Sequence, residues 1–165
     1  MKNRFIPIAI VLISIASVAY ASFATSLTVN GTGTATGNWA VDIISITPTA
    51  QTGATDHVST PSFTATSATF NVDLAYPGAT SSYNVAIKNN GNITAKLSTI
   101  TDLTSLNASA PTYITYAVTG VTVNSTLAPG ATATATVTVT WASSATTNPA
   151  GANKSATINF NYIQN

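Results

Sequence analysis

The side chains that acid–base or nucleophilic catalysis requires are scarce in this chain. It contains one His, four acidic residues that are all Asp, and neither Cys nor Glu. His57 directly follows Asp56, and a serine hydrolase would use such a pair to activate a Ser nucleophile. No G-x-S-x-G motif marks that Ser. We therefore expect His57 to be a solvated loop residue, and we predict no catalytic residue and no enzymatic activity.

Residues that hold metal ions or form covalent staples are equally dispersed. A zinc site needs several His or Cys ligands, which the sequence does not supply. No D-x-D run suggests calcium, because the aspartates stand apart at Asp42, Asp56, Asp73 and Asp102. A Lys–Asn or Lys–Asp isopeptide bond usually needs a neighbouring acid, typically Glu, and only Asp could serve here. The sequence predicts no metal site and no cofactor.

Tyrosines and sequons offer two kinds of surface chemistry. Four tyrosines could form a sugar-binding platform, although tyrosines in strands are more often core or cross-strand residues; they are Tyr76, Tyr83, Tyr113 and Tyr116. Candidate N-glycosylation sequons begin at Asn30, Asn92, Asn107, Asn124 and Asn153. Ser and Thr are so common that about this many sequons arise by chance. They permit glycosylation without arguing for it.

The elements that would position these residues are β-strands. Thr and Ala dominate the composition, and Thr favours strands, whereas the Glu and Lys that surface helices normally use are absent or few. Segments 68–74, 83–87 and 131–141 alternate apolar and polar residues, which is the period of a half-buried strand. We predict an all-β fold, an antiparallel two-sheet sandwich of the jelly-roll type.

About eight short strands should alternate with turns and loops. A strand at Trp39–Ile46 is apolar enough to be central, and Pro48 should stop it. The turn signals are Tyr76-Pro77-Gly78, the Asn-Gly turn at 88–92 and Leu127-Ala128-Pro129-Gly130. The other expected strands run from 93 to about 103, over 113–123 and over 156–162, with loops at 49–61, 103–112 and 142–153.

The first 21 residues have the features of a cleaved secretion signal. Lys2 and Arg4 precede an apolar run, Phe5–Tyr20, and Ala19-Tyr20-Ala21 is an A-x-A cleavage site. The apolar run is shorter than the ~20 residues that span a bilayer, although an uncleaved membrane anchor is the alternative. Cleavage leaves 144 of the 165 residues, and the net charge falls from +1 to −1. So weakly charged a surface does not favour nucleic acid or acidic membranes, and we expect an extracellular or cell-surface protein.

The mature chain then begins with a strand on a tether. In Ser22–Asn30 the residues Phe23, Thr25, Leu27 and Val29 share one face of an extended chain. The following stretch, Gly31–Gly37, holds three glycines and predicts a flexible linker. We therefore expect three parts: the signal at 1–21, a polymerisation strand with its linker at 22–38, and a β-sandwich domain at 39–165. The strand completes its own sandwich or a neighbour's, and the sequence leaves both open.

Several motifs of the chain occur together in a known family. Ala19-Tyr20-Ala21 is followed by Ser22-Phe23-Ala24 and then by Gly37-Asn38-Trp39-Ala40-Val41-Asp42. Later come the Tyr76-Pro77-Gly78 turn, the Tyr83–Ala95 segment, and Leu127-Ala128-Pro129-Gly130 before Val137–Trp141. In this order the motifs resemble the TasA–camelysin family of secreted fibre proteins and the related archaeal bundling pilins. Some members carry a peptidase label, but this chain has no H-E-x-x-H and no second His, so that activity is not transferred.

The resemblance implies a jelly-roll subunit that polymerises by donor-strand exchange. The N-terminal strand of one subunit would fill a gap in the sheet of the next, which builds pili or biofilm-matrix fibres. The partners would be other copies of the chain, with or without a minor anchor subunit, and neither nucleic acid nor a small-molecule substrate. The alternative is a monomeric cell-surface adhesin or carbohydrate-binding module, in which the tyrosines and the loops at 49–61 and 142–153 would form the binding surface.

Overall fold

In the computed structural model, the described residues are 28–57, 59–145 and 154–165. The chain divides into two units, Met1–Ala35 and Thr36–Asn165. In the first unit, residues 28–35 are exposed and have no regular secondary structure. The predicted signal and the strand residues Phe23, Thr25 and Leu27 lie outside the described residues. Val29 is 89% exposed.

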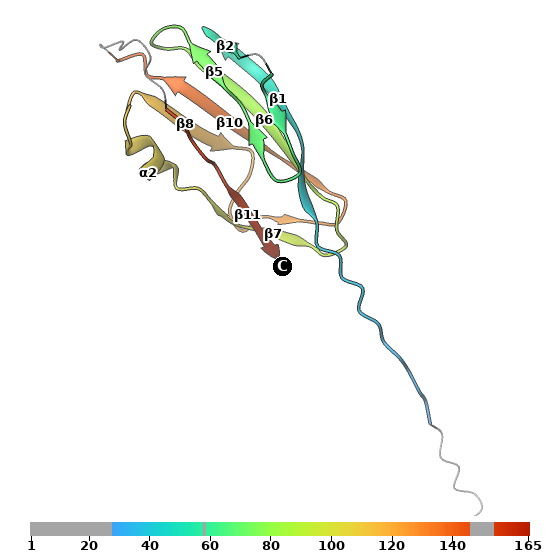
Figure 1. The fold of residues 1–165 in the computed structure, drawn as a ribbon. Helices are drawn as coiled ribbons and strands as arrows, with labels where there is room; N and C mark the ends of the chain where they lie inside the picture. The colour runs from blue at the N-terminus through green and yellow to red at the C-terminus, as the bar shows by residue number, and fades with distance from the viewer. Residues whose placement is uncertain (1–27, 58, 146–153) are drawn as a thin grey trace, which may run out of the picture. The chain divides into compact units, whose positions relative to one another are not determined.

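The second unit is an all-β antiparallel sandwich, as predicted (Figure 1). Among the described residues, one sheet has the strand order β1-β6-β10-β8, a second has the order β11-β7-β9, and two small sheets pair β2 with β5 and β3 with β4. The strands of the first two sheets are β1 (Val41–Thr52), β6 (Thr80–Asn89), β10 (Thr132–Trp141), β8 (Ile114–Thr119), β11 (Phe160–Gln164), β7 (Ala95–Ile100) and β9 (Thr126–Leu127). The remaining elements are β2 (Ala54–Asp56), β3 (Ser62–Phe63), β4 (Ala68–Thr69), β5 (Val72–Leu74) and α2 (Leu103–Ala108).

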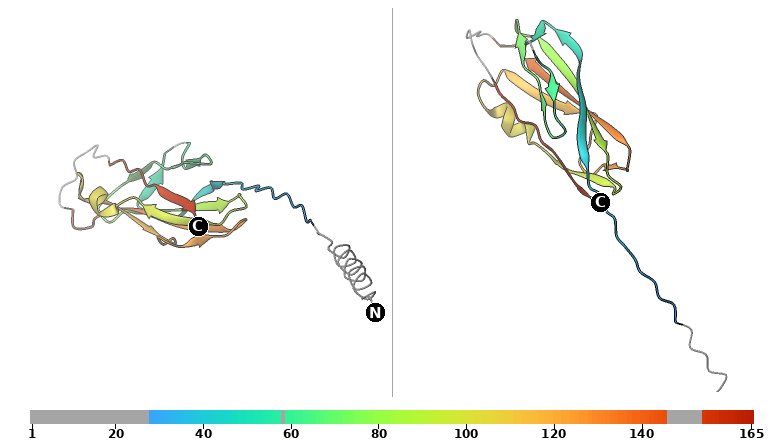
Figure 2. Two further views of the ribbon diagram at one scale, coloured as in Figure 1. Left: turned by 90° about the horizontal axis from the view of Figure 1, so that it is seen from below. Right: turned by 45° about the vertical axis from the view of Figure 1, so that its right-hand side comes forward.

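The core lies between two layers (Figures 1 and 2). One layer is the four-stranded sheet β1-β6-β10-β8, and the other contains β11, which passes over that sheet. Strand β10 buries Ala135, Val137, Val139 and Trp141, while its threonines are partly or fully exposed. This alternation confirms the predicted face of the strand. Strand β6 buries alternate residues in the same way, because it lies between β1 and β10. Its Tyr83 is fully buried and stacks on Phe70, with ring centroids 4.5 Å apart.

The first strand of the sandwich differs from the prediction. Strand β1 continues through Pro48 to Thr52, and it is an edge strand rather than a central one. An edge strand tolerates Pro because one side of its backbone has no ladder partner that needs the missing N–H. The register also shifts between Pro48 and Ala50, which accommodates the irregularity. The predicted stop at Pro48 is therefore wrong.

The segment that looked irregular in the sequence contains a short helix. Asp102 caps α2, since its carboxylate accepts hydrogen bonds from the Thr104 N–H at 2.9 Å and the Ser105 hydroxyl at 2.6 Å. These hydrogen bonds lower the pKa of Asp102, and the bond from the Ser105 hydroxyl has the largest effect. Two strands are shorter than predicted. Strand β7 ends at Ile100, and the last strand, β11, begins only at Phe160. Within the expected loop at 49–61, residues 49–52 form the end of β1 and residues 54–56 form the whole of β2.

Candidate functional site

The structure separates the residues from which the sequence could have built a catalytic pair. His57 Nε2 lies 2.9 Å from Asp73 Oδ1, and both side chains are largely exposed. Asp56 instead accepts a hydrogen bond from the buried Tyr83 hydroxyl. Burial, assisted by this hydrogen bond, raises the pKa of Tyr83 to about 12. The adjacent Asp56 and His57 thus have different partners: His57 contacts Asp73 of β5, and Asp56 joins β2 to Tyr83 of β6.

The four tyrosines do not share an exposed surface. Tyr83 and Tyr116 are core residues, and Tyr113 packs on Trp141 with ring centroids 5.9 Å apart. Tyr76 is half-exposed. A sugar platform made of these rings is therefore not formed, and the sequence prediction that tyrosines in strands are mostly core residues holds for Tyr83 and Tyr116.

The sequons fall into two groups by what their amide nitrogens do. Asn92 Nδ2 donates to the Thr36 carbonyl oxygen at 2.7 Å, and Asn107 Nδ2 donates to the Tyr116 carbonyl oxygen at 2.9 Å. A glycan would leave only one N–H on either nitrogen and would have to be accommodated beside that hydrogen bond. Asn30 and Asn124 are exposed. Asn153 lies outside the described residues.

A groove of about 1230 Å³ lies between the two layers of the sandwich. Its floor consists of alternate apolar side chains from the first sheet, which include Val41, Ile43, Val85, Ile87, Val137 and Val139. Those of Val85, Ile87, Val137 and Val139 are only 3–4% exposed, because rim side chains such as Phe70 and Ile158 pack against them. The volume exceeds the roughly 300–1,000 Å³ of ordinary small-molecule pockets. A groove with an apolar strand-like floor is better suited to a chain segment than to a small ligand.

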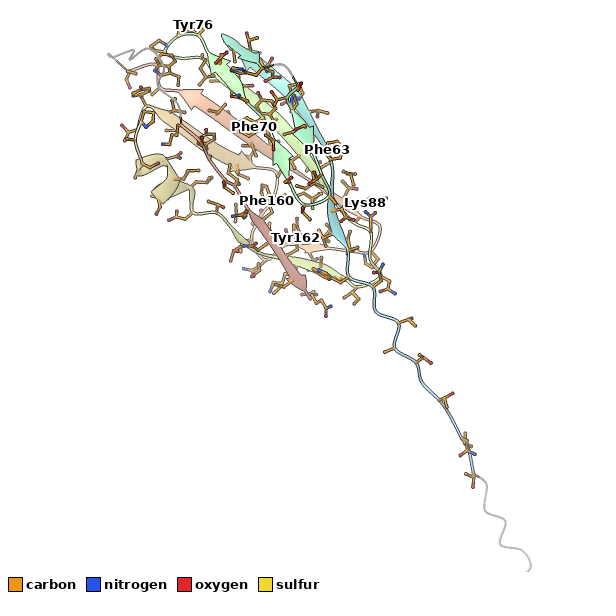
Figure 3. All side chains as sticks on the ribbon, viewed as in Figure 1. Phe63, Phe70, Tyr76, Lys88, Phe160 and Tyr162 are labelled. Atoms are coloured by element: carbon orange, nitrogen blue, oxygen red, sulfur yellow. The ribbon has the colours of Figure 1, made fainter. Side chains whose placement is uncertain are left out.

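Each side of the groove is formed by an uninterrupted stretch of chain. We call residues 65–74 the hairpin rim and residues 154–162 the β11 rim; all members of both stretches line the groove. A strand that presents one face contributes every second residue, because successive side chains point to opposite faces. Within the two stretches, residues 68–69, 72–74 and 160–162 are strand, and there the continuous lining indicates that the edge of the backbone borders the groove. Figure 3 shows Phe70 on the hairpin rim, and Phe160 and Tyr162 on the β11 rim.

The strands of both rims are paired on one side. In the part of the chain that the structure describes, β11 is the last strand of its sheet, and β4 and β5 each pair with a single strand. Backbone groups of both rims also bond to the sandwich outside the ladders, since the Ile43 N–H donates to Ala65 O at 2.7 Å and the Thr101 N–H donates to Asn159 O at 3.1 Å. Such an edge is a template for a further strand.

The β11 rim is anchored at its start by Lys154, which the sequence gave no reason to single out. Its ammonium donates to the carbonyl oxygens of Asn107, Ser109, Pro111 and Ile114 at 2.9–3.3 Å. Its own carbonyl oxygen accepts from the Tyr116 hydroxyl at 2.6 Å. Burial lowers the pKa of Lys154, and the carbonyl dipoles offset part of the cost of burying the charge. Lys154 thereby joins the groove to the end of α2 and the start of β8.

Two buried polar atoms lie at this same end of the groove. Within residues 28–57, 59–145 and 154–165, the Tyr113 hydroxyl and the Trp141 indole N–H have no hydrogen-bond partner. Both side chains line the groove. A strand in the groove would bring backbone carbonyl oxygens close to these donors.

Fold and site together define an antiparallel β-sandwich protein with a strand-sized groove between its layers. Comparison with known proteins adds no relative: no family model, no curated protein and no solved structure matches the chain. The helix that the structure describes is too short and too polar to cross a membrane. Within the described ranges, no group of three or more His, Asp or other metal-binding residues gathers at one place.

Proposed function

We propose that the protein is a secreted structural subunit that polymerises by donor-strand exchange into extracellular filaments. The N-terminal strand Ser22–Asn30 of one copy would fill the groove of the next. The observation that carries this proposal is the groove itself, which combines an apolar floor with a backbone edge along both rims. The resemblance to TasA–camelysin proteins, the signal-like residues 1–21 and the description of the sandwich as a jelly roll belong to the same proposal.

The dimensions of the groove suit the proposed strand. The β11 rim has nine residues, and Ser22–Asn30 has nine as well. The side chains that would face the floor are Phe23, Leu27 and Val29. Burial of each would contribute roughly 1.5–3 kcal/mol to the free energy of association. Backbone hydrogen bonds to the rims would add about 0.5–1.5 kcal/mol each. Together these terms can exceed an association cost of roughly 4–15 kcal/mol.

Electron microscopy of variants on the donor strand tests the proposal. Deletion of Ser22–Asn30 should abolish filaments, and so should Leu27→Asp, because a carboxylate in the apolar groove would lack a partner. Thr28→Asp is the matched control, since Thr28 lies on the other face of the same strand and should tolerate a charge. Mixing the deletion variant with the Leu27→Asp variant should give no polymer at any ratio. Filaments from that mixture would refute donor-strand exchange.

Two neighbouring residues of β1 test the acceptor side. Ile43 lines the groove, whereas Ile44 is 41% exposed and points away from it. We expect Ile43→Asp to prevent polymerisation and Ile44→Asp to leave it unchanged. The competing adhesin function predicts instead a persistent monomer that binds glycans, with no difference between the two variants.

A further inference from the structure

The turn that follows β6 holds the start of the sandwich domain in place. The Asn92 side chain bonds two backbone groups, since its Nδ2 donates to Thr36 O and its Oδ1 accepts from the Asn38 N–H, each at 2.7 Å. The Asn92 N–H also donates to Asn38 O at 3.0 Å, and the Gly91 N–H donates to Ala40 O at 3.1 Å. A side chain at Gly91 would overlap the Asn38 carbonyl oxygen. We call this arrangement the Asn92 clip.

The Asn92 clip lies at the same end of the sandwich as the C-terminal end of β11. Gln164 pairs with Ala95, and the Asn165 N–H donates to Thr94 O at 3.0 Å, only two residues beyond Asn92. The C-terminus and the start of β1 lie close together at this end (Figure 1). We call this end of the sandwich the turn end. We call the opposite end of the groove, where the Lys154 ammonium donates to Ile114 O, the lysine end.

The clip limits where the preceding strand can go within its own chain. With Thr36 fixed, only residues 31–35 of the linker are free, and they let residue 30 move at most about 22 Å from Thr36. The nine residues of the β11 rim span about 26 Å at ~3.3 Å per residue. A strand that runs antiparallel to β11 places residue 30 at the lysine end, beyond the reach of Thr36 in the same chain. Within one chain the strand can therefore enter only parallel to β11.

The direction of the strand also decides between a closed dimer and an open filament. Two copies that exchange strands through their turn ends are related by a two-fold axis and form a closed pair. In that pair the exchanged strand again runs parallel to β11. An open chain of subunits requires each strand to leave at the turn end of one copy and enter at the lysine end of the next. This arrangement makes the strand antiparallel to β11.

We propose that the strand in the groove comes from a second copy and runs antiparallel to β11, so that the turn end of each subunit meets the lysine end of the next. The inference rests on the proposed filament function and adds the direction in which successive subunits of the filament are joined. A flexible linker that permitted insertion within one chain would provide an effective strand concentration near millimolar. At micromolar protein, self-insertion would then dominate roughly a thousandfold. The Asn92 clip and the short free linker block the antiparallel form of self-insertion.

Engineered cysteine pairs in the full mature chain test this polarity, because the natural chain has no Cys. One variant carries Val29→Cys with Ser155→Cys at the lysine end, and the other carries Val29→Cys with Ile163→Cys at the turn end. Ser155 belongs to the β11 rim and Ile163 directly follows that rim, and both residues are exposed. The two positions are eight residues apart along the same extended stretch, which a short bismaleimide cannot bridge. The single-cysteine variants are the controls for random coupling.

We expect the Val29/Ser155 pair to give an SDS-resistant ladder of cross-linked subunits, and the Val29/Ile163 pair to give none. A ladder from the Val29/Ile163 pair in visible filaments would overturn the polarity and leave the filament function intact. Cross-linked monomers or dimers from that pair, without filaments, would overturn both proposals. Filaments without cross-links in either pair would show that the strand does not lie along the β11 rim, and this outcome also overturns the inference.

Discussion

At the scale of single residues, Lys154 is the side chain whose environment departs most from expectation. Lys is rarely buried without an acidic partner, yet here four backbone carbonyl oxygens receive its ammonium. Its carbonyl oxygen also accepts a hydrogen bond from the Tyr116 hydroxyl, which holds the start of the β11 rim against β8. The groove therefore depends on a polar contact that lies at one end of its apolar floor.

Removal of this ammonium should weaken the sandwich. Lys154→Met keeps most of the stem but leaves buried carbonyl oxygens without donors, and we expect a loss of about 3 kcal/mol in the free energy of unfolding. Chemical denaturation measures the effect. Lys96→Met, at a partly exposed position of β7, is the control and should change stability by less than about 0.5 kcal/mol. Equal effects of the two substitutions would contradict the structural role of Lys154.

Tyr83 should make stability depend on pH in the alkaline range. Its pKa rises to about 12 in the folded protein, whereas an unfolded Tyr titrates near 10. The neutral phenol is favoured by folding, so its contribution is complete below pH ~10 and is lost as the pH rises toward 12. A difference of two pKa units corresponds to roughly 2–3 kcal/mol.

The comparison of wild type with Tyr83→Phe isolates this contribution. We expect the difference in unfolding free energy between the two proteins to shrink steadily between pH 10 and 12, because only the wild type has this phenol to ionise. Lysines, including Lys154 with its lowered pKa, titrate in both proteins and cancel in the difference. Denaturation curves at several pH values provide the measurement. A constant difference across this range would mean that Tyr83 is not buried as a neutral phenol.

At the scale of elements, the sequence predicts those strands whose two faces differ in chemistry. The alternation of Thr with Ala and Val in β10 fixes both its period and its buried face. Pro48 misleads because a local rule cannot tell an edge strand from a central one, and the neighbours of β1 are set by long-range pairing. Helix α2 has weak propensity, and the cap at Asp102 together with packing on β8 stabilises it.

The sequence predicts that an apolar acceptor groove exists, but it does not predict which segments form the rims of this groove. An unpaired N-terminal strand implies an acceptor somewhere, and the apolar residues of its floor follow from strand periodicity. The rims are different, because β4 and β5 are only two and three residues long and part of the β11 rim has no regular structure. Neither Lys154 nor Asn92 shows its role in the sequence, since a Lys and a turn Asn are ordinarily solvated.

The Asn92 clip can be tested as an element without reference to filaments. Asn92→Ala removes both side-chain bonds to the linker, and the amide of Asn38 should then exchange with solvent at least tenfold faster. Asn92→Asp retains an acceptor for the Asn38 N–H and loses the donor to Thr36 O, so it should have an intermediate effect. Hydrogen exchange with mass spectrometry measures both. Unchanged exchange in Asn92→Ala would show that the turn does not hold residues 36–38.

At the scale of the whole molecule, weak charge and an open groove favour self-association over recognition of charged partners. The chain has five basic and four acidic residues, with a net charge of +1, so long-range steering contributes little. Specificity must then come from shape and backbone pairing along the two rims. In the proposed filament every copy would carry both a strand and a groove, so linker length decides whether the strand can enter its own groove antiparallel to β11.

A longer linker should convert the polymer into a self-complemented monomer. Ten Gly and Ser residues inserted between Gly33 and Thr34 extend the free linker from five to fifteen residues, with a mean end-to-end distance of roughly 20–24 Å and ample reach for a groove of about 26 Å. The strand can then enter its own groove antiparallel to β11, and at micromolar protein this route should dominate. We expect monomers in analytical ultracentrifugation, and the Val29/Ser155 cysteine pair should cross-link within one chain. The same insertion between Ser143 and Ser144, two exposed residues, should leave polymerisation intact. Undiminished filaments from the long-linker variant would mean that something other than linker reach prevents antiparallel self-insertion.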